Sequence, residues 1–430
     1  AIAFNFLAAC FLLYLLRGTE QRLVLFVAML FTPFLYSSLL GFSTLTFSAA
    51  FVLCIYAYLS RSQWFYLSIL LLCLIRPDGV VWGSGLVLLR LIDAKKDEYF
   101  SSEVMQMIIH LVVPGISYFV WRVWYFGEWL PLPFLVKATG ERDFLIFYRD
   151  SLHSVLVVFV PLLIGISLNR DARLLKRFIM FFGIPVIFYA TMRLEQNIGN
   201  RFMAPLFFGG LYLVLVFCEA RYAAILVALS VYPSINTAVG TLSNLLSSRY
   251  EVVYQLSKDL SAVRGRMLIT EAGRLAYYSN WVVDDSWGLN TPRFAHSLIA
   301  TEDVTRSDYD LVVAHCDLQL LRQDTISAGT SRSWSNQCGA IVSAIKDGSF
   351  YVYLVPFHSR NIGLRVAIKE ELGLFDPTAA VVIDCQRYDI YAVQKKSAIA
   401  EEIKNIMIRN SGIQYSSKVQ LLGWDRACRP

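Results

Sequence analysis

The feature that most constrains this chain is a series of long apolar runs, separated by short loops, over its first 240 residues. A membrane span needs roughly 20 apolar residues. Ten runs reach or approach that length: residues 1–16, 23–40, 43–60, 64–75, 79–92, 105–121, 152–169, 178–192, 203–218 and 222–239. We therefore expect an all-α membrane bundle of about ten transmembrane helices over residues 1–240. The two shortest runs flank Arg76-Pro77-Asp78-Gly79 and are expected to be a broken pair.

Charged side chains divide the chain into two parts. Residues 1–240 hold 31 of the 72 Asp, Glu, Lys and Arg residues, and residues 241–430 hold the other 41. The first part carries 18 basic and 13 acidic side chains, and its basic residues gather in alternate loops. The positive-inside rule places such loops in the cytoplasm and explains the basic character without nucleic acid. Nucleic-acid binding is therefore excluded, and residues 241–430 are expected to lie outside the cytoplasm.

Residues 241–430 have the pattern of a soluble α/β domain. Short β-branched and aromatic runs alternate with polar and helical stretches, which favours strands interleaved with helices. The expected helices lie near residues 247–263 and 396–409. The expected strands cover residues 265–270, 276–278, 281–284, 309–314, 349–355, 379–384 and 388–393.

The cysteines are consistent with export of this second part. Four of the eight cysteines lie in apolar runs, and the other four are Cys316, Cys338, Cys385 and Cys428. In an oxidising compartment these four permit two disulfides, with three connectivities open. No Cys or His spacing indicates a metal site, so none is predicted.

Several polar side chains border the apolar runs on the expected outer side. Arg76, Arg122, Lys137 and Arg201 are candidates to converge on one anionic group, most naturally a phosphate, because charges at membrane depth are costly and tend to be functional. Arg193 lies in the same set of loops. Tyr125 belongs to an aromatic run that could cover a sugar face or a lipid tail.

Structural explanations remain open for the same residues. Lys137 and Arg201 could extend to the membrane interface, and Tyr125 could belong to an aromatic belt. Asp78 could pair with Arg76 or cap the following helix. Arg122 lies among large apolar residues, so we expect it to face the cavity of Arg76 and Arg201, paired with Asp78, Glu128 or Glu195.

These residues resemble motifs of the polytopic GT-C glycosyltransferases, in particular the mycobacterial terminal arabinofuranosyltransferase group. The R-P-[DE]-G turn of that group matches Arg76–Gly79, and its R-F-x-x-P matches Arg201–Pro205. Its R-x-x-[YW]-[YF]-G-[DE]-x-L-P-N-T-x-x-x-K segment resembles residues 122–137, RVWYFGEWLPLPFLVK, where Leu-Pro replaces Asn-Thr. Residues 271–279 and 284–290 resemble its A-G-x-x-x-Y-Y-S and D-x-x-G-L-x-D stretches.

The resemblance implies inverting transfer of a sugar from a polyprenyl-phosphate donor to a glycan, lipid or protein acceptor outside the cytoplasm. It implies a multi-pass protein of the bacterial inner (plasma) membrane with a periplasmic or extracellular C-terminal domain. The cations would stabilise the departing phosphate, and a carboxylate would deprotonate the acceptor hydroxyl. Asp78 and Glu128 are the nearby candidates for that base. The superfamily also allows a divalent cation, Mg or Mn.

The family places acidic residues in its first outer loop, and nothing acidic precedes Glu20 here. Together with the expected exported start at Ala1, this predicts an N-terminally truncated chain whose catalytic base lies upstream. Two other functions stay open: a transporter or flippase of a lipid-linked saccharide, and a non-catalytic envelope scaffold.

Overall fold

The computed structural model divides the chain into two compact units, and each is described by itself. The first unit consists of residues 1–127 and 142–243, and the second of residues 128–141 and 244–430. Residues 128–141, expected with the helical domain, therefore belong to the second unit. The structure describes residues 2–39, 42–96, 98–138, 144–168, 172–192, 198–218, 220–231, 251–270, 273–306, 308–321, 333–356, 382–384, 388–410, 412–415 and 420–422.

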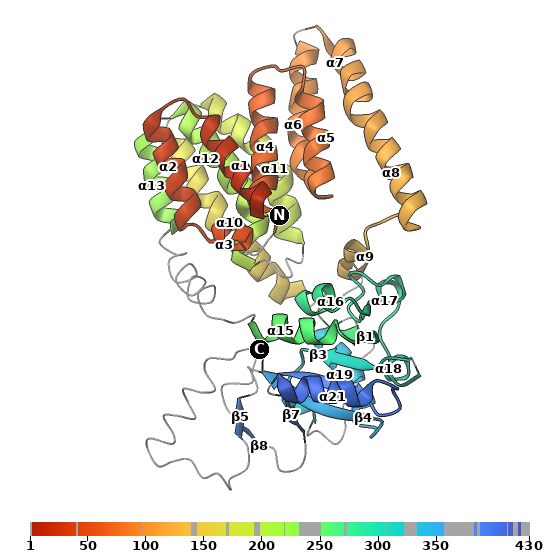
Figure 1. The fold of residues 1–430 in the computed structure, drawn as a ribbon. Coiled ribbons are helices and arrows are strands. Elements are labelled where there is room, and N and C mark those ends of the chain that lie inside the picture. The colour runs from red at the N-terminus through yellow and green to blue at the C-terminus, as the bar shows by residue number, and fades with distance from the viewer. Residues whose placement is uncertain are drawn as a thin grey trace, which may run out of the picture. The chain divides into compact units, whose positions relative to one another are not determined.

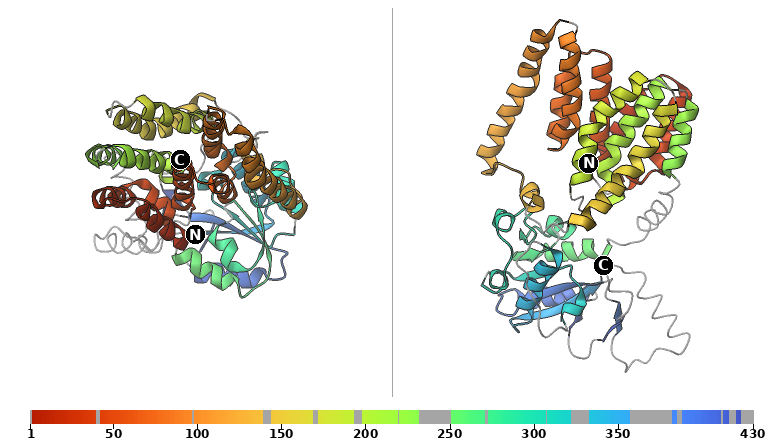
Figure 2. Two further views of the ribbon diagram at one scale, coloured as in Figure 1. Left: turned by 90° about the horizontal axis from the view of Figure 1, so that it is seen from above. Right: turned by 180° about the vertical axis from the view of Figure 1, so that it is seen from behind.

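The first unit is helical (Figures 1 and 2). Its first half contains α1 (Ile2–Tyr14), α2 (Thr19–Phe31), α3 (Pro33–Leu39), α4 (Thr44–Leu59), α5 (Phe65–Ile75), α6 (Gly79–Lys96) and α7 (Phe100–Met107). A π-helical segment (Ile108–Val112) joins α7 to α8 (Val113–Phe126). Its second half contains α10 (Phe144–Leu168), α11 (Ala172–Thr191), a 3-10 segment (Ile198–Met203), α12 (Ala204–Phe217) and α13 (Ala220–Val231).

Helices α4 and α12 form the centre of this unit. Every residue of α12 from Ala204 to Leu215 is buried, and α4 is buried along most of its length. Phe51 of α4 contacts Trp82 of α6 and Phe182 of α11 edge-on, with ring centroids 5.1 and 5.8 Å apart. A helix that is apolar all round needs such complete burial in protein or lipid.

The expected bundle of about ten membrane spans is wrong. In the described residues, two helical stretches are long and apolar enough to cross a membrane, Phe100–Phe126 and Asn200–Phe217. Most of the other expected spans fold into shorter helices, such as the 13-residue α1 and the 11-residue α5. At 1.5 Å per residue, 13 residues extend about 20 Å, well short of the roughly 30 Å hydrocarbon core.

Backbone breaks inside the apolar runs explain this correction. The expected span over residues 23–40 is divided because Thr32 has extended backbone, with ψ 155°, before Pro33. A proline disfavours the helical conformation of the preceding residue. Counting apolar residues does not detect such a break. The hydropathy pattern therefore predicts a longer helix here than the structure contains.

The second unit contains a mixed six-stranded sheet with strand order β2-β1-β3-β6-β4-β7. Strand β1 (Arg266–Ile269) pairs in parallel with β2 (Val282–Asp285) and β3 (Leu311–Ala314). Strand β6 (Tyr388–Gln394) pairs antiparallel with β3 and with β4 (Phe350–Pro356), which also pairs antiparallel with β7 (Ile413–Gln414). Strands β5 (Val382–Asp384) and β8 (Gln420–Leu422) form a separate parallel pair.

Helices cover both faces of the six-stranded sheet. Alternate residues of β1 belong to two separate cores: Leu268 packs on one face, and Met267 and Ile269 on the other. The first core includes α17 (Pro292–His296), α18 (Thr301–Arg306), a 3-10 turn (Leu318–Leu321) and α19 (Trp334–Ile345). The second core includes α15 (Glu251–Leu260), α16 (Arg274–Ser279) and α21 (Ala400–Arg409). Among its described residues, this unit also contains the short helix α9 (Leu132–Ala138).

One expected strand is a helix. The aromatic pair Tyr277-Tyr278 suggested a strand over residues 276–278, but these residues lie in α16. Asn280, with φ 57°, ends the helix in the left-handed conformation that asparagine tolerates. The other expected strands overlap β1, β2, β3, β4, β5 and β6.

A tight turn follows β2 in the motif over residues 284–290. The Asp285 carboxylate accepts hydrogen bonds from the backbone N–H groups of Trp287 (3.0 Å) and Asn290 (3.2 Å). Burial raises the pKa of Asp285, although the backbone donors favour its charged form and oppose that shift. Gly288 has φ 86°, and a Cβ there would lie 2.4 Å from the backbone of Phe294. The aspartate and the glycine of this motif are therefore explained by the geometry of the turn.

Gly288→Ala should destabilise the second unit more than Gly348→Ala. Both glycines have positive φ, 86° and 89°, but a Cβ at Gly348 has nothing within 4 Å. Gly348→Ala should cost only the left-handed conformation, about 1–2 kcal/mol, while Gly288→Ala must also displace backbone. Thermal unfolding of the two full-length variants measures the difference, and equal losses would contradict the packing of this turn.

Candidate functional site

A proline sets the geometry of the break between α5 and α6. Arg76 ends α5 with extended backbone, φ −149° and ψ 138°, directly before Pro77. Asp78 follows, and its carbonyl accepts the N–H of Trp82 in the first turn of α6. The break therefore places the side chains of Arg76 and Asp78 together at the end of one helix and the beginning of the next.

These two side chains form an ion pair within a longer chain of hydrogen bonds. Arg76 donates from Nε to Oδ1 of Asp78 (3.0 Å) and from Nη2 to Oδ2. The Tyr189 hydroxyl of α11 donates to Oδ2 of Asp78 and accepts from Nε1 of Trp82 (3.1 Å). The side chains of Arg76 and Asp78 are 16% and 20% exposed. The carboxylate thus accepts three hydrogen bonds in a largely water-excluded place.

A second guanidinium lies close to the first. The Cζ atoms of Arg76 and Arg201 are each 5.2 Å from the ring centroid of Phe202. Arg201 also lies 3.7 Å from the ring centroid of Phe42, and Arg76 lies 4.4 Å from that of Phe47. Three aromatic rings therefore surround two cations and one carboxylate, a set with a net charge of +1. We call Arg76, Asp78, Tyr189 and Arg201 the arginine cluster.

One donor of the arginine cluster has no acceptor in the part of the chain that the structure describes. Nη1 of Arg201 is buried and has no hydrogen-bond partner among the described residues. A buried donor without an acceptor is costly, about 1–3 kcal/mol and more for a charged group. The geometry is therefore suited to an anion that accepts from Arg201 beside the Arg76–Asp78 pair.

The structure gives Arg122 and Tyr125 a different neighbourhood. Both lie on α8, where Cζ of Arg122 is 5.7 Å from the ring centroid of Phe126. No hydrogen bond or ion pair between described residues joins Arg122 to Asp78. Tyr125 is 64% exposed and stacks on Trp121, with ring centroids 5.5 Å apart.

The remaining candidates lie in the second unit or outside the described residues. Oε1 of Glu128 is 2.9 Å from Nε2 of His296 in α17. Lys137 is part of α9, but its side chain, like Arg193 and Glu195, lies outside the described residues. Sequence analysis missed Tyr189 and Trp82. Trp82 follows Asp78 by four residues, one helical turn, whereas no local signal marks Tyr189.

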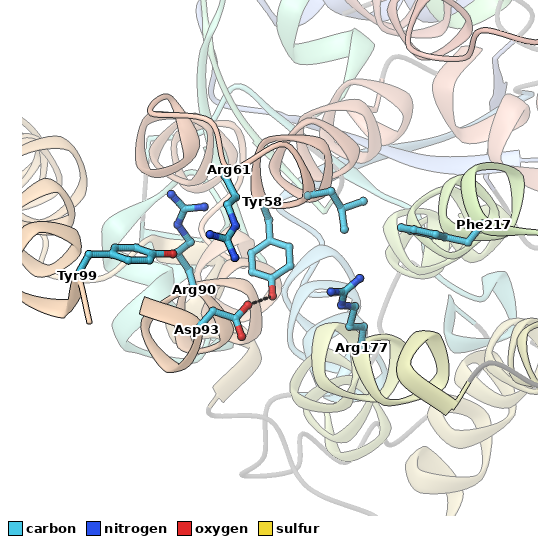
Figure 3. A pocket seen from close by; sticks show the side chains of 8 residues that line it. Tyr58, Arg61, Arg90, Asp93, Tyr99, Arg177 and Phe217 are labelled. Carbon is cyan, nitrogen blue, oxygen red and sulfur yellow. Dashed lines mark hydrogen bonds between the residues drawn. The ribbon is translucent and has the colours of Figure 1, made fainter. Parts of the chain in front are cut away.

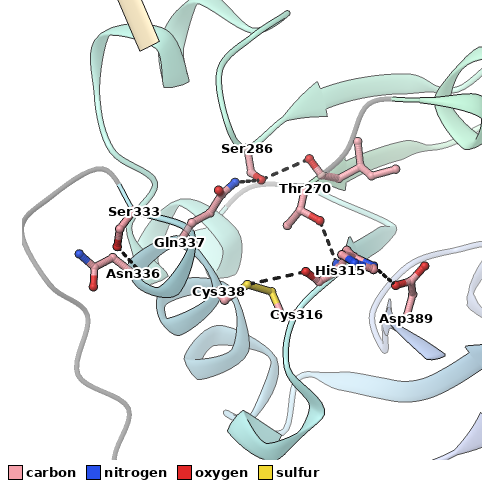
Figure 4. The surroundings of a disulfide bond; sticks show 10 residues. Thr270, Ser286, His315, Cys316, Ser333, Asn336, Gln337, Cys338 and Asp389 are labelled. Carbon is pink, nitrogen blue, oxygen red and sulfur yellow. Dashed lines mark hydrogen bonds and ion pairs between the residues drawn. A yellow bond between two sulfur atoms is a disulfide. The ribbon is translucent and has the colours of Figure 1, made fainter. Parts of the chain in front are cut away.

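The second unit has a polar cluster at the carboxyl ends of its parallel strands (Figure 4). Backbone N–H of His315, after β3, donates to Thr270 Oγ1 (2.9 Å), after β1. Nδ1 of His315 lies 2.5 Å from Oδ1 of Asp389, and Gln337 donates to Ser286 Oγ. Ligands of α/β sheets commonly bind at such edges.

Two of the four candidate cysteines, Cys316 and Cys338, form a disulfide beside this cluster, with Cα atoms 5.6 Å apart. It joins the end of β3 to α19. Cys385 and Cys428 lie outside the described residues. No group of three or more His, Cys, Asp or Glu side chains in the described part of the chain could hold a metal ion.

No protein-family model, no curated protein and no solved structure matches this chain.

Tyr189→Phe should lower the free energy of unfolding by about 1–3 kcal/mol, because Trp82 keeps a buried N–H that loses its acceptor. Trp82 is only 1% exposed. Tyr212→Phe is the matched control: Tyr212 is also buried in the first unit, and its hydroxyl has no hydrogen bond among the described residues. Chemical unfolding of both full-length variants is the measurement, and equal losses would show that the Tyr189 hydroxyl contributes nothing specific.

Proposed function

We propose that this chain is a membrane-bound glycosyltransferase that moves a sugar from a polyprenyl-phosphate donor to a cell-envelope acceptor outside the cytoplasm. In this proposal the arginine cluster binds the phosphate of the donor. The sugar, a pentose or a hexose, and the acceptor, a glycan, lipid or protein, are not assigned.

The observation that carries the proposal is the pair of guanidiniums around Phe202. Among the described residues, the buried Nη1 of Arg201 has no acceptor, and Arg76 forms an ion pair with one carboxylate, that of Asp78. Planar guanidiniums match the oxygens of a phosphate and bind them through paired hydrogen bonds. The rings of Phe42 and Phe47 exclude water, which strengthens these interactions.

The resemblance to GT-C enzymes supports the same assignment. The turn at residues 76–79 and the segment at residues 201–205 match two separate motifs of that group, and both contribute to the arginine cluster. Residues distant in sequence that meet around one potential anion site are better explained by a shared ligand than by independent surface roles.

The proposal gives Asp78 a positioning role. Its two oxygens already accept from Arg76 and Tyr189, so it orients the guanidinium of Arg76 toward the donor. The cations would stabilise negative charge that develops on the departing phosphate. The base that deprotonates the acceptor is not assigned to a residue of the arginine cluster.

The surface of the first unit supports a membrane location. None of the most apolar stretch of Phe100–Phe126 is buried, and large side chains such as Phe4, Trp124 and Ile187 are more than 60% exposed. Extended apolar surface of this kind marks contact with a membrane or with partners. The disulfide of the second unit is in keeping with an exported location at the bacterial plasma membrane.

Arg76→Lys should weaken donor binding at least tenfold, because an ammonium keeps the charge but loses the planar pair of donors. The assay uses the full chain in detergent with radiolabelled polyprenyl-phosphate pentoses and hexoses. It measures how much labelled donor the protein retains. It also measures transfer of the labelled sugar to an acceptor in the presence of Mg²⁺, of Mn²⁺ or of a chelator. Asp78→Asn should also weaken retention, because Arg76 loses its orienting carboxylate.

Arg266→Lys is the matched control, since Arg266 forms an ion pair with Asp284 (2.7 Å) in the second unit. It should retain the donor like the unchanged protein. If the unchanged protein binds no polyprenyl-phosphate sugar, or if a folded Arg76→Lys variant binds it equally well, the proposed function is wrong.

A further inference from the structure

A buried asparagine lies in the apolar helix α1, and its side-chain amide forms four hydrogen bonds. Asn5 is only 3% exposed. Its Nδ2 donates to the backbone carbonyls of Ser38 (3.0 Å) and Phe42 (2.7 Å). Its Oδ1 accepts from the backbone N–H (3.1 Å) and from the hydroxyl (2.9 Å) of Thr46. An asparagine amide offers two donors and two acceptor sites, so the hydrogen-bonding capacity of this group is fully used.

The four hydrogen bonds join α1 to the segment where α3 ends and α4 begins. Ser38 lies in the last turn of α3, and Thr46 lies in the first turn of α4. Phe42 lies between these helices, and its own N–H donates to the carbonyl of Ser37 (3.1 Å). The first N–H groups of a helix have no acceptor within that helix. Asn5 therefore caps α4 from another helix and also holds the backbone of Phe42.

Capping alone does not account for all of these bonds. Ser43 is the N-cap residue of α4, and serine is well suited to that role, yet its side chain makes no capping hydrogen bond among the described residues. The bond from Asn5 to the carbonyl of Phe42 satisfies no group of α4. An amide buried in an apolar helix is costly unless it is hydrogen-bonded. The position of Phe42 is a reason to place such a group here.

Phe42 carries one of the rings that surround the arginine cluster. Cζ of Arg201 lies 3.7 Å from the centroid of this ring. A guanidinium over an aromatic ring at this distance is attracted to the ring, and the ring shields one side of it from water. Water competes with an anion for the donors of Arg201. The position of the Phe42 ring therefore affects how strongly Arg201 binds an anion.

We propose that Asn5 is a positioning residue for the arginine cluster. It fixes the segment that holds the ring of Phe42 against Arg201, and through that ring it strengthens the binding of the donor phosphate by Arg201. This inference rests on the proposed function, because it assumes that the arginine cluster binds the donor.

The test measures retention of radiolabelled polyprenyl-phosphate sugar by the full chain in detergent. Asn5→Leu removes all four hydrogen bonds and should weaken retention at least fivefold. Thr46→Val is the milder variant, because it keeps the shape of the side chain and removes only the hydroxyl that donates to Asn5. It should weaken retention about twofold, and Thr46→Ser, which keeps the hydroxyl, should restore it.

Tyr58→Phe is the matched control, since it also removes one hydroxyl hydrogen bond of α4. Tyr58 lies near the other end of this helix, in a cavity of about 220 Å³ where its hydroxyl donates to Asp93 (2.5 Å; Figure 3). Twelve residues of helix separate it from Thr46, which corresponds to about 18 Å. Tyr58→Phe should retain the donor like the unchanged protein.

A double-mutant cycle separates positioning from a general loss of stability. Phe42→Leu removes the ring from Arg201 and should weaken retention at least threefold. Because Asn5 acts through this ring, Thr46→Val should cause no further loss when Phe42→Leu is already present. A purely structural role would give Thr46→Val the same loss in both backgrounds.

The outcomes distinguish this inference from the proposed function. If the unchanged protein retains the donor, the inference alone is overturned when Thr46→Val and Tyr58→Phe lose equal retention, or when the losses of Thr46→Val and Phe42→Leu multiply. If the unchanged protein retains no donor, the proposed function and the inference are both wrong.

Discussion

The carboxylate of Asp78 is the group on which the candidate site depends. It accepts from Arg76 at the break between two helices and from Tyr189 on a third helix. Without it, a guanidinium that is only 16% exposed would lose its counter-ion, which costs several kcal/mol in a protein interior. The same carboxylate holds the guanidinium of Arg76, whose Cζ lies 5.2 Å from the ring centroid of Phe202.

The local part of this arrangement could be predicted from the sequence. Arg76 and Asp78 stand two residues apart around a proline, so a turn that joins them follows from local geometry alone. Tyr189 donates a hydrogen bond to Asp78, which lies 111 residues earlier in the sequence. The apolar residues beside Tyr189 do not indicate that its hydroxyl has a polar partner. Such a contact depends on how α6 packs on α11, which a single sequence does not reveal.

The fold was predictable where the pattern is strictly local. The strands of the second unit follow from short runs of β-branched and aromatic residues, and Leu268 and Ile269 on opposite faces show the expected alternation. The helical unit was not predictable in the same way. Mean hydropathy depends on composition alone. Pro33 and Pro77 interrupt helices but hardly change the mean hydropathy of the surrounding sequence, so hydropathy does not reveal these breaks.

The disulfide changes how the second unit responds to cleavage of its chain. Cys316 and Cys338 are 22 residues apart, and the intervening sequence contains Arg322 and Arg332. A protease cut at either arginine breaks the polypeptide, but the sulfur bridge keeps both halves on one covalent framework. β3 and α19 therefore stay tethered after a nick, and the two fragments separate only after reduction. Such a bond makes the covalent connection between β3 and α19 independent of an intact peptide chain between the two cysteines.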